Sequence, residues 1–342
     1  MDKIKIFIDW EFLGKKDAAV EKINPLLYPI IAKMDPKDPN FTSRFDYYEY
    51  TSDMEAADFI MLPYYLNLYE KRNLLLFLDS KFAFAEGKIK TLIWIDGDHE
   101  LDWWPESAII FHKGHINRSD SRQWVDLPEI PDLTKEWPIV YHEKSIKPKV
   151  AFTGQASTKK HFLWLLRNWN WKRKYSAATT LWIPPSEPHI KLRKTALDIL
   201  EKDSRINADF IRRERYLGSN RAAEMERQEY LENLNNNPYS LCVRGGGNFS
   251  FRFFESLCLG GIPILIDTDV LLPFQDQIDW DKHILRVKWT ELKSLPERLI
   301  EFHNALSEEK FIQLQKENRA IWLKYFSLPG YFEQLHHLLK DV

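Results

Sequence analysis

Short apolar runs separated by longer amphipathic stretches constrain the fold of this chain more than any other feature. In the first part, runs typical of strands occur at 4–8, 58–62, 91–95 and 107–111, and a helical pattern occupies 74–84. Strands that alternate with helices favour βαβ units and a parallel sheet, whose ligands bind beyond the carboxyl ends of the strands. We therefore expect an α/β fold with a Rossmann-like first domain.

A second α/β pattern begins after a proline-rich break. The break lacks helical periodicity and contains four prolines, Pro128, Pro131, Pro138 and Pro148. Beyond it, we expect strands at 149–154, 239–243 and 262–266 and helices at 189–201, 220–234, 250–259 and 308–325. The pattern predicts an N-terminal domain at 1–145, a second domain at 146–325, and a C-terminal helix at 326–342 that is free to pack back on the first domain.

Composition and length exclude several classes of protein. At 342 residues the chain is long enough for two cores. Its 48 basic and 50 acidic residues give a net charge of −2, so we expect no nucleic-acid partner, because proteins that coat nucleic acid are basic. Cys242 and Cys258 are too few for a disulfide scaffold. Because we find neither a signal-peptide pattern nor an apolar run of about 20 residues, we expect a cytoplasmic location.

The segment 241–280 carries the clearest chemical signal. The glycines Gly245–Gly247 follow an expected strand and precede an expected helix, so their N–H groups and the helix dipole favour an anion. Arg244 and Arg252 flank the glycines and supply guanidinium groups, whose geometry suits phosphate. Glu255, one turn into the helix, has the carboxylate oxygens needed to accept hydrogen bonds from ribose hydroxyls.

The expected helix at 250–259 has two distinct faces. Its apolar stripe consists of Phe251, Phe254 and Cys258, and Phe253 and Leu257 widen it. Arg252 and Glu255, three residues apart, are expected on the other face. A glycine-rich turn followed by a surface Arg252–Glu255 pair is the simpler alternative to an anion site, and the spacing alone leaves both readings open.

The same segment resembles the signature of the exostosin-type glycosyltransferases. Cys-Val-Arg-Gly at 242–245, Ser-Phe-Arg at 250–252, Glu-Ser-Leu at 255–257 and Gly-Gly-Ile-Pro-Ile at 260–264 are similar to the family's Cys-Pro-Arg-Gly, Ser-x-Arg, Glu-Ala-Leu and Gly-Cys-Ile-Pro-Val. The similarity continues in register through Asp269, Leu-Pro-Phe at 272–274 and Ile-Asp-Trp at 278–280. Val243 and Gly261 depart from the family's Pro and Cys.

Weaker matches extend the resemblance upstream, through 56–65 and through Phe-Thr-Gly at 152–154 with Arg193. The resemblance implies a soluble bacterial or viral member of the family, with a GT-B fold of two Rossmann-like domains facing a central cleft. It further implies an inverting transferase that moves a sugar from a nucleoside-diphosphate sugar, with a UDP-sugar favoured, to a glycan acceptor such as a surface polysaccharide or a lipid-linked oligosaccharide.

The family's chemistry is understood as inverting direct displacement. Because we find no convincing Asp-x-Asp metal motif on the donor side, we expect cationic side chains and the helix dipole to take the place of a metal ion, with no further cofactor. Carried over to this sequence, the donor-binding residues are Arg193, Arg244, Gly245, Gly246, Gly247, Ser250, Arg252 and Glu255. A protein of this fold that has lost catalysis and only binds a sugar or a partner is the second hypothesis. An unrelated nucleotide-dependent enzyme is disfavoured, because no Gly-x-Gly-x-x-Gly follows the first strand.

A base is also needed to take the proton of the acceptor hydroxyl. The candidates are acids that follow the third and first expected strands, ranked Asp98, then Asp96, then Glu11. Ordinary loop acids are the alternative reading. Asp96-Gly97-Asp98 also spells an Asp-x-Asp pattern, so metal binding stays open at that point.

One further segment, 161–174, combines tryptophans with basic residues: Trp164, Trp169, Trp171, Lys172, Arg173 and Lys174. Such a segment is suited to the surface of a membrane with anionic headgroups, which would bring the enzyme to the inner face of the membrane and to a lipid-linked acceptor. A helix that faces the protein core is the alternative.

Overall fold

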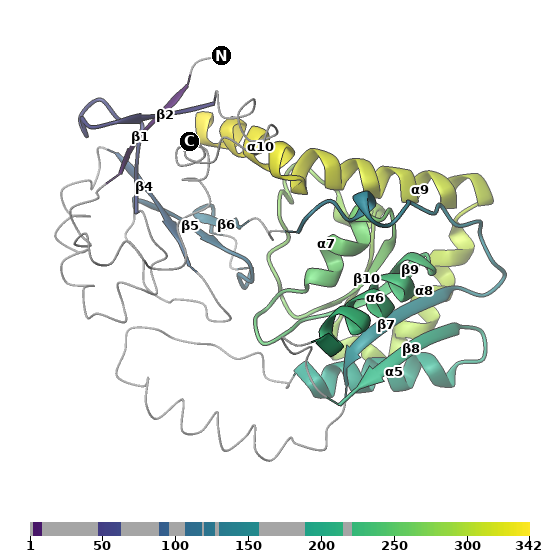
Figure 1. Cartoon of the computed structure of the whole chain (residues 1–342). Coiled ribbons are helices and arrows are strands. Elements are labelled where there is room, and N and C mark those ends of the chain that lie inside the picture. Colours follow the sequence, from purple (N-terminus) through teal and green to yellow (C-terminus); the bar gives the residue numbers. More distant parts are fainter. Residues whose placement is uncertain are drawn as a thin grey trace, which may run out of the picture. The chain divides into compact units, whose positions relative to one another are not determined.

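The computed structural model describes residues 3–8, 47–62, 89–95, 107–117, 120–126, 130–156, 189–214 and 221–342. The chain divides into two compact units (Figure 1). The first unit holds the described residues of Met1–Leu127 and Leu328–Val342, and the second holds those of Pro128–Ala178 and Ile183–Ser327. Each unit is built on one parallel sheet, which confirms the predicted α/β fold with two Rossmann-like sheets.

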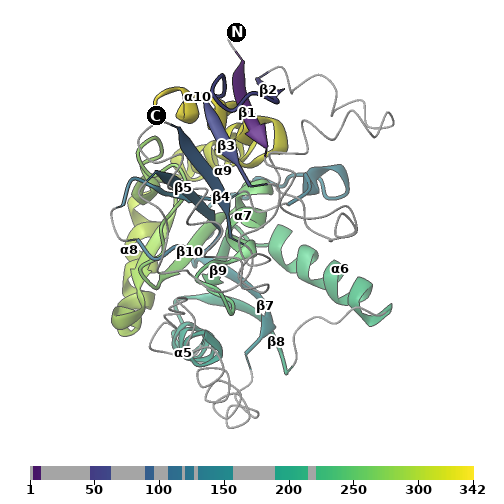
Figure 2. The ribbon, with the colours of Figure 1, turned by 90° about the vertical axis from the view of Figure 1, so that its left-hand side faces the viewer.

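The first unit contains a sheet in the order β2-β1-β3-β4-β5-β6. Its strands are β1 (Ile4–Ile8), β2 (Tyr48–Thr51), β3 (Phe59–Met61), β4 (Lys90–Trp94), β5 (Ala108–His112) and β6 (Gln123–Val125). The chain's last helix, α10 (Leu328–Lys340), contacts β1, and the Tyr48 hydroxyl donates to the Phe332 carbonyl at 3.1 Å (Figure 2). The C-terminal helix therefore completes the first unit.

The second unit contains a sheet in the order β11-β10-β9-β7-β8. Its strands are β7 (Lys149–Gln155), β8 (Asn207–Arg213), β9 (Tyr239–Val243), β10 (Ile262–Asp267) and β11 (Leu285–Lys288). Its helices are α5 (His189–Lys202), α6 (Arg221–Asn235), α7 (Phe251–Cys258), α8 (Leu295–Ala305) and α9 (Glu308–Ile321), which runs into a π-helical turn at Trp322–Phe326. In chain order the strands are arranged 2-1-3-4-5, so the order reverses between β7 and β9.

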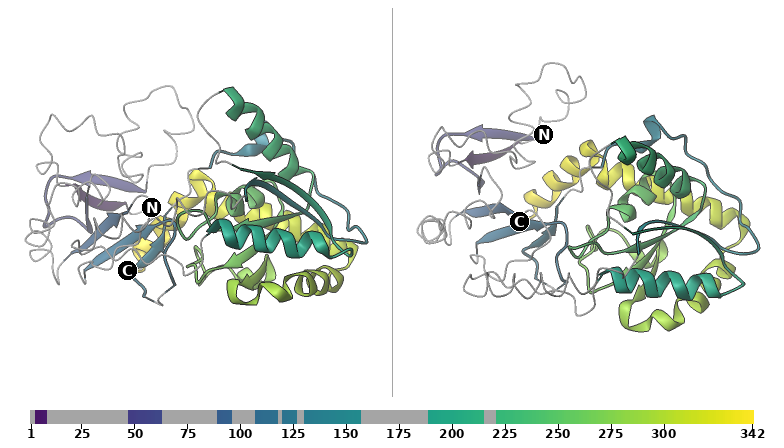
Figure 3. Two further views of the ribbon diagram at one scale, coloured as in Figure 1. Left: turned by 90° about the horizontal axis from the view of Figure 1, so that it is seen from below. Right: turned by 60° about the horizontal axis from the view of Figure 1, so that its bottom comes forward.

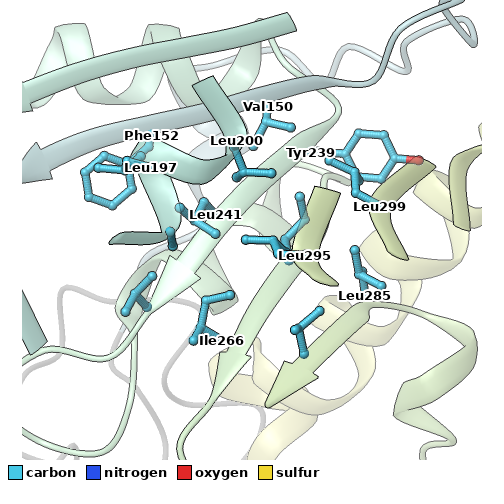
Figure 4. Packing of buried hydrophobic residues seen from close by; sticks show 14 of the residues in the cluster. Val150, Phe152, Leu197, Leu200, Tyr239, Leu241, Ile266, Leu285, Leu295 and Leu299 are labelled. Atoms are coloured by element: carbon cyan, nitrogen blue, oxygen red, sulfur yellow. The ribbon is translucent and has the colours of Figure 1, made fainter. Parts of the chain in front are cut away.

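Side chains that alternate along β9 fill two different cores. Tyr239, Leu241 and Val243 join an aliphatic core with α5 and α8, in which Leu197 and Leu295 are buried (Figure 4). Cys242 points to the opposite face and joins a second core. That core is rich in aromatic side chains from α6, α7 and the π-helical turn: Tyr230, Phe253, Phe254, Trp322, Tyr325 and Phe326. Helices thus cover both faces of the sheet (Figure 3), as a doubly wound fold requires.

The segment before β7 is fixed to the second unit by a polar network. The Arg319 guanidinium on α9 donates to the Cys258 carbonyl at 2.8 Å and to the Asp132 carboxylate at 3.0 Å. The Leu133 N–H, in the short helix Leu133–Lys135, donates to the Cys258 sulfur at 3.4 Å. These bonds tie the chain that enters the second unit to the C-terminal end of α7.

Two glycines end α7 in a crowded turn. Gly260 has a left-handed φ of +77°, which favours glycine. A Cβ on Gly261 would lie 2.6 Å from the Ser256 hydroxyl oxygen, so a side chain there would have to displace that hydroxyl. The Ser256 hydroxyl in turn accepts a hydrogen bond from Ser240 on β9 at 2.7 Å. Ser256 therefore contacts both β9 and the turn that follows α7.

Candidate functional site

The residues that the resemblance assigns to the donor gather at the carboxyl edge of the second sheet, where the strand order reverses. The glycine segment 245–247 follows β9, and its neighbour β7 ends at Gln155. The carboxyl ends of parallel strands lie at the same edge, and a reversal in strand order leaves room for a ligand there. This edge is the candidate site.

Arg252, in the first turn of α7, bridges the two strands at the reversal. Its guanidinium donates to the Leu241 carbonyl of β9 at 3.1 Å and to the Thr153 carbonyl of β7 at 2.5 Å. It also lies 4.3 Å from the centre of the Phe152 ring. A cation held by two carbonyls and an aromatic face has a fixed position, which makes Arg252 part of the sheet edge.

Glu255 is buried, with 6% of its surface exposed, and it is paired with residues of α6. Its carboxylate forms an ion pair with Arg227, whose Nη2 lies 2.7 Å from Oε1, and accepts a hydrogen bond from the Tyr230 hydroxyl. Burial and, after it, the Glu255 charge raise the pKa of Tyr230 well above its usual value, so the phenol keeps its proton and remains a donor. The alternative of a surface Arg252–Glu255 pair does not describe the structure.

Phe251, the first residue of the expected apolar stripe, is exposed. Its side chain is 44% exposed and lies edge-on to the Phe249 ring, with the ring centres 5.1 Å apart. Phe251 is the first residue of α7, and Phe253 and Phe254, two and three residues later, belong to the aromatic core. The predicted stripe therefore begins with an exposed residue, and the buried side chains of α7 start at Phe253.

The glycine segment is held from both sides. The Gly245 N–H donates to the Phe249 carbonyl at 2.9 Å, so it does not face an anion as expected. In the described part of the chain, the N–H groups of Gly246 and Gly247 make no such bond. Asn248 and Thr268 exchange hydrogen bonds at 2.5 and 3.3 Å, and these attach the segment to the end of β10.

Two arginines lie on the α5 side of the glycine segment. Arg244 is buried, and its guanidinium donates to the carbonyls of Gly245 and Gly246 at 3.3 and 3.5 Å. Arg193 on α5 donates to the Arg244 carbonyl at 2.9 Å and to the Gln155 carbonyl at 3.4 Å. Arg193 and Arg244 therefore lie together at this edge, as the resemblance implies.

His189, at the start of α5, belongs to the same group of side chains. Burial lowers the pKa of His189 to about 3, and the charges of Arg193 and Arg244 contribute to that shift. The ring is therefore neutral near pH 7. Sequence reasoning missed this histidine, although its position four residues before Arg193 puts both on one face of α5.

A second Asp-x-Asp pattern, Asp267-Thr268-Asp269, ends β10 at this edge. Asp267 is buried and accepts hydrogen bonds from the Val270 N–H at 3.1 Å and from Arg286 at 2.9 Å. Asp269 is exposed and has a φ of +60°, which aspartate tolerates better than most residues. Across the described ranges, no group of three or more His, Cys, Asp or Glu side chains is placed to hold a metal ion.

Several predicted residues lie outside the described residues. They are the candidate bases Asp98, Asp96 and Glu11 and the proposed membrane-contact residues Trp164, Trp169, Trp171, Lys172, Arg173 and Lys174.

Ser250 is the residue immediately before α7, and its hydroxyl makes no capping hydrogen bond to that helix. No helix of the described residues is long and apolar enough to cross a membrane.

Comparison with known proteins matches the part of the chain that contains the candidate site. The family model described as the Exostosin GT47 domain matches residues 143–302. Exostosin-1c of Danio rerio is 33% identical over 104 residues, which cover 30% of this chain and 14% of that protein. The Exostosin-1 homolog of Caenorhabditis elegans is 33% identical over 102 residues, which cover 30% of this chain and 26% of that protein. The matched stretch thus spans a small part of these relatives.

Among solved structures, this chain is similar to a point mutant of S. aureus TarM in complex with Fondaparinux, alpha-GlcNAc-glycerol and UDP. The identity is 9%, the match covers 82% of this chain and 55% of TarM, and the TM-score of 0.35 is too low to inform the fold. The family model and the exostosin relatives, together with the signature at the sheet edge, identify residues 143–302 of this chain as an exostosin GT47 domain.

Proposed function

We propose that this chain is an inverting glycosyltransferase, which transfers a sugar from a nucleoside-diphosphate sugar, with a UDP-sugar favoured, to a glycan acceptor. The observation that carries the proposal is the set of arginines fixed at the β7–β9 reversal: Arg193, Arg244 and Arg252. Membership of the domain in the exostosin GT47 family favours glycosyl transfer over other reactions that an anion site would serve.

The arginines would stabilise the leaving nucleoside diphosphate as its negative charge grows. Arg193 and Arg252 are each held by two backbone carbonyls, so their charges are in place before the reaction and need little reorganisation. The N–H groups of Gly246 and Gly247 and the hydroxyl of Ser250 would add neutral donors. These groups would supply the charge stabilisation that direct displacement needs, and we therefore propose a metal-independent reaction without a further cofactor.

Glu255 would accept hydrogen bonds from the ribose hydroxyls. Each carboxylate oxygen has more than one acceptor direction, so the ion pair with Arg227 and the hydrogen bond from Tyr230 leave Glu255 with acceptor capacity for a ligand hydroxyl. Those two partners also fix the carboxylate in one orientation. A preoriented acceptor loses little conformational entropy on binding, which supports a role in donor affinity rather than in the chemical step.

For the acceptor we propose a surface polysaccharide or a lipid-linked oligosaccharide, reached in the second case through the tryptophan-rich segment 161–174. The acceptor hydroxyl needs a base, and we propose Asp98, with Asp96 and Glu11 next in order. Asp98→Asn should lower kcat by about 100-fold or more while donor affinity stays within about twofold. Normal turnover in this variant would show that Asp98 is not the base and would favour Asp96 or Glu11.

A thermal-shift screen against UDP, GDP, CMP and dTDP, with and without magnesium, tests the donor site. We expect one nucleoside diphosphate to raise the melting temperature, and magnesium to leave that shift unchanged. No shift with any nucleotide would overturn the donor assignment and favour a protein that has lost catalysis and only binds a sugar or a partner. A nucleotide shift without turnover on any acceptor would favour the same alternative.

A further inference from the structure

Tyr230 on α6 contacts both of the charged α7 residues that the resemblance assigns to the donor. Its hydroxyl donates to Glu255 Oε2, and its ring centre lies 5.4 Å from the guanidinium carbon of Arg252. Only 6% of its surface is exposed, and its ring belongs to the aromatic core that α6 and α7 share. The phenol therefore has a fixed place beside both the carboxylate and the cation.

Arg227, three residues before Tyr230, lies on the same face of α6. Its Nη2 is 2.7 Å from Glu255 Oε1, and its guanidinium carbon is 5.1 Å from the Tyr230 ring centre. The two oxygens of Glu255 thus have different partners, a cation at Oε1 and a phenol at Oε2. The carboxylate cannot turn about its terminal bond without breaking one of these contacts.

Packing alone does not call for a carboxylate at position 255. The apolar contacts of α7 with the aromatic core come from Phe253, Phe254 and Leu257. Burying a carboxylate costs free energy, which its partners must offset, and an apolar group of similar volume is often at least as stable in such a place. The buried carboxylate therefore points to recognition of a ligand.

The fixed carboxylate has acceptor capacity left on both oxygens. Each oxygen of an ionised carboxylate offers about two acceptor directions, and Arg227 and Tyr230 occupy one on each. One more hydrogen bond can therefore be accepted at Oε1 and one at Oε2. A ligand with hydroxyls on two neighbouring carbons, such as the 2′- and 3′-hydroxyls of ribose, matches this arrangement.

We propose that Glu255 selects ribonucleotide donors over 2′-deoxyribonucleotide donors, and that Tyr230 and Arg227 are positioning residues for this selection. The inference rests on the proposed function. Ribose donates one hydrogen bond to each carboxylate oxygen, whereas 2′-deoxyribose has a single hydroxyl and leaves one buried acceptor direction unfilled. A site built to hydrogen-bond a substrate hydroxyl discriminates against the analogue that lacks it, because its buried polar group then loses a partner.

A purely structural role for these contacts predicts a different outcome. If Tyr230 and Arg227 served only to neutralise a carboxylate that touches no ligand, replacing either would weaken ribonucleotides and deoxyribonucleotides by the same factor. The ratio of the two affinities would then stay constant. This ratio therefore separates the positioning of a ligand-binding group from a general loss of stability.

Isothermal titration calorimetry measures the ratio with two matched pairs, UDP against 2′-deoxy-UDP and GDP against 2′-deoxy-GDP. For the ribonucleotide that binds, we expect the wild-type chain to prefer it to its deoxy form by about tenfold or more. Tyr230→Phe removes the hydroxyl but keeps the ring beside Arg252. It should lower the ratio to about threefold, through weaker binding of the ribonucleotide.

Two further variants complete the test. Arg227→Met should lower the ratio in the same direction, and 41% of the Arg227 side chain is exposed, so the fold should tolerate the change. Tyr239→Phe is the matched control: Tyr239 is also buried, at the opposite end of β9, with its hydroxyl 3.0 Å from His303 Nδ1. It should keep the wild-type ratio.

The outcomes separate this inference from the proposed function. Equal binding of a ribonucleotide and its deoxy form by the wild type overturns the selection and leaves the donor site standing. A wild-type ratio in Tyr230→Phe overturns the role of Tyr230, and the same result in Arg227→Met overturns that of Arg227. Failure of both UDP and GDP to bind the wild type overturns the donor site and this inference with it. Arg227→Met keeps the test decisive if Tyr230→Phe does not fold.

Discussion

The two sides of the second sheet bring different electrostatics to the same edge. On the α5 side, His189, Arg193 and Arg244 are all basic. On the α7 side, the cations Arg252 and Arg227 are accompanied by the buried carboxylate of Glu255. Within the described residues, positive charge is therefore concentrated on one side and compensated on the other. This difference suits a ligand with an anionic diphosphate at one end and neutral hydroxyls at the other.

The strongest test of this comparison is Arg252, which links the two sides. Arg252→Ala removes the cation and leaves the carbonyls of Thr153 and Leu241 without their donor. We expect donor affinity to fall about 100-fold or more and stability to fall by about 1–3 kcal/mol. Calorimetry with the nucleotide found in the screen and denaturant unfolding measure the two effects.

Arg298→Ala is the matched control for Arg252. This arginine on α8 is paired with Glu291 at the surface and should tolerate the change, because exposed ion pairs contribute little. If donor affinity is unchanged in Arg252→Ala, Arg252 does not bind the donor. The contrast between the two sides of the sheet would then have no bearing on donor binding at the residue that links them.

The compensated side predicts that Glu255 and Arg227 depend on each other. Glu255→Gln leaves Arg227 without its carboxylate and should lower stability by about 1–2 kcal/mol and donor affinity about tenfold. The double variant Glu255→Gln, Arg227→Gln should lose less stability than the two single variants together. Strict additivity in urea unfolding would show that the pair is not coupled.

The cationic side predicts acid sensitivity of the ligand-free protein. His189 has a pKa of about 3 when folded and about 6.5 when unfolded, so the unfolded state binds more protons between these values. Stability is therefore complete above about pH 6.5 and is lost as the pH falls toward 3. We expect the melting temperature to fall between about pH 7.5 and about pH 5, and to fall less in His189→Gln. Equal slopes for both proteins would contradict the burial of this ring.

A smaller effect is expected at the C-terminal end of α7, away from the charges of either side. Gly261→Cys forces a Cβ to within 2.6 Å of the Ser256 hydroxyl and should destabilise by about 1–3 kcal/mol. Ser256→Ala loses the bond from Ser240 but opens that space, at a loss of about 1 kcal/mol. The double variant should be more stable than Gly261→Cys alone, as thermal melting would measure. Donor affinity should stay at the wild-type value in all three.

Interior strands were predictable from the sequence, and edge strands were not. The strands expected near 4–8, 58–62, 91–95, 107–111, 149–154, 239–243 and 262–266 are β1, β3, β4, β5, β7, β9 and β10, which have a neighbour on each side. The missed strands β2, β6, β8 and β11 are the four sheet edges. An edge strand such as β8 is partly exposed along its length and carries polar residues, so it lacks an apolar run.

The site was predictable where its residues are contiguous. Arg244, the glycines, Arg252 and Glu255 lie within one signature, and the structure brings Arg193 to them. The partners of Glu255 were not foreseen, because Arg227 and Tyr230 meet it only when α6 packs beside α7. His189 was missed because the spacing to Arg193 is common on helices and gains meaning only from the carbonyls that anchor that arginine.

The crowded turn after α7 has a consequence for the search for relatives. The exostosin signature has Ala and Cys where this chain has Ser256 and Gly261, which counts as two departures when each position is scored alone. The Ser256 hydroxyl occupies the space that a side chain at 261 would need. The larger residue at 256 and the smaller residue at 261 therefore compensate for each other. Patterns that allow Ala with Cys or Ser with Gly as linked pairs should find further domains with this turn, and the mixed combination of Ser with Cys should be rare among them.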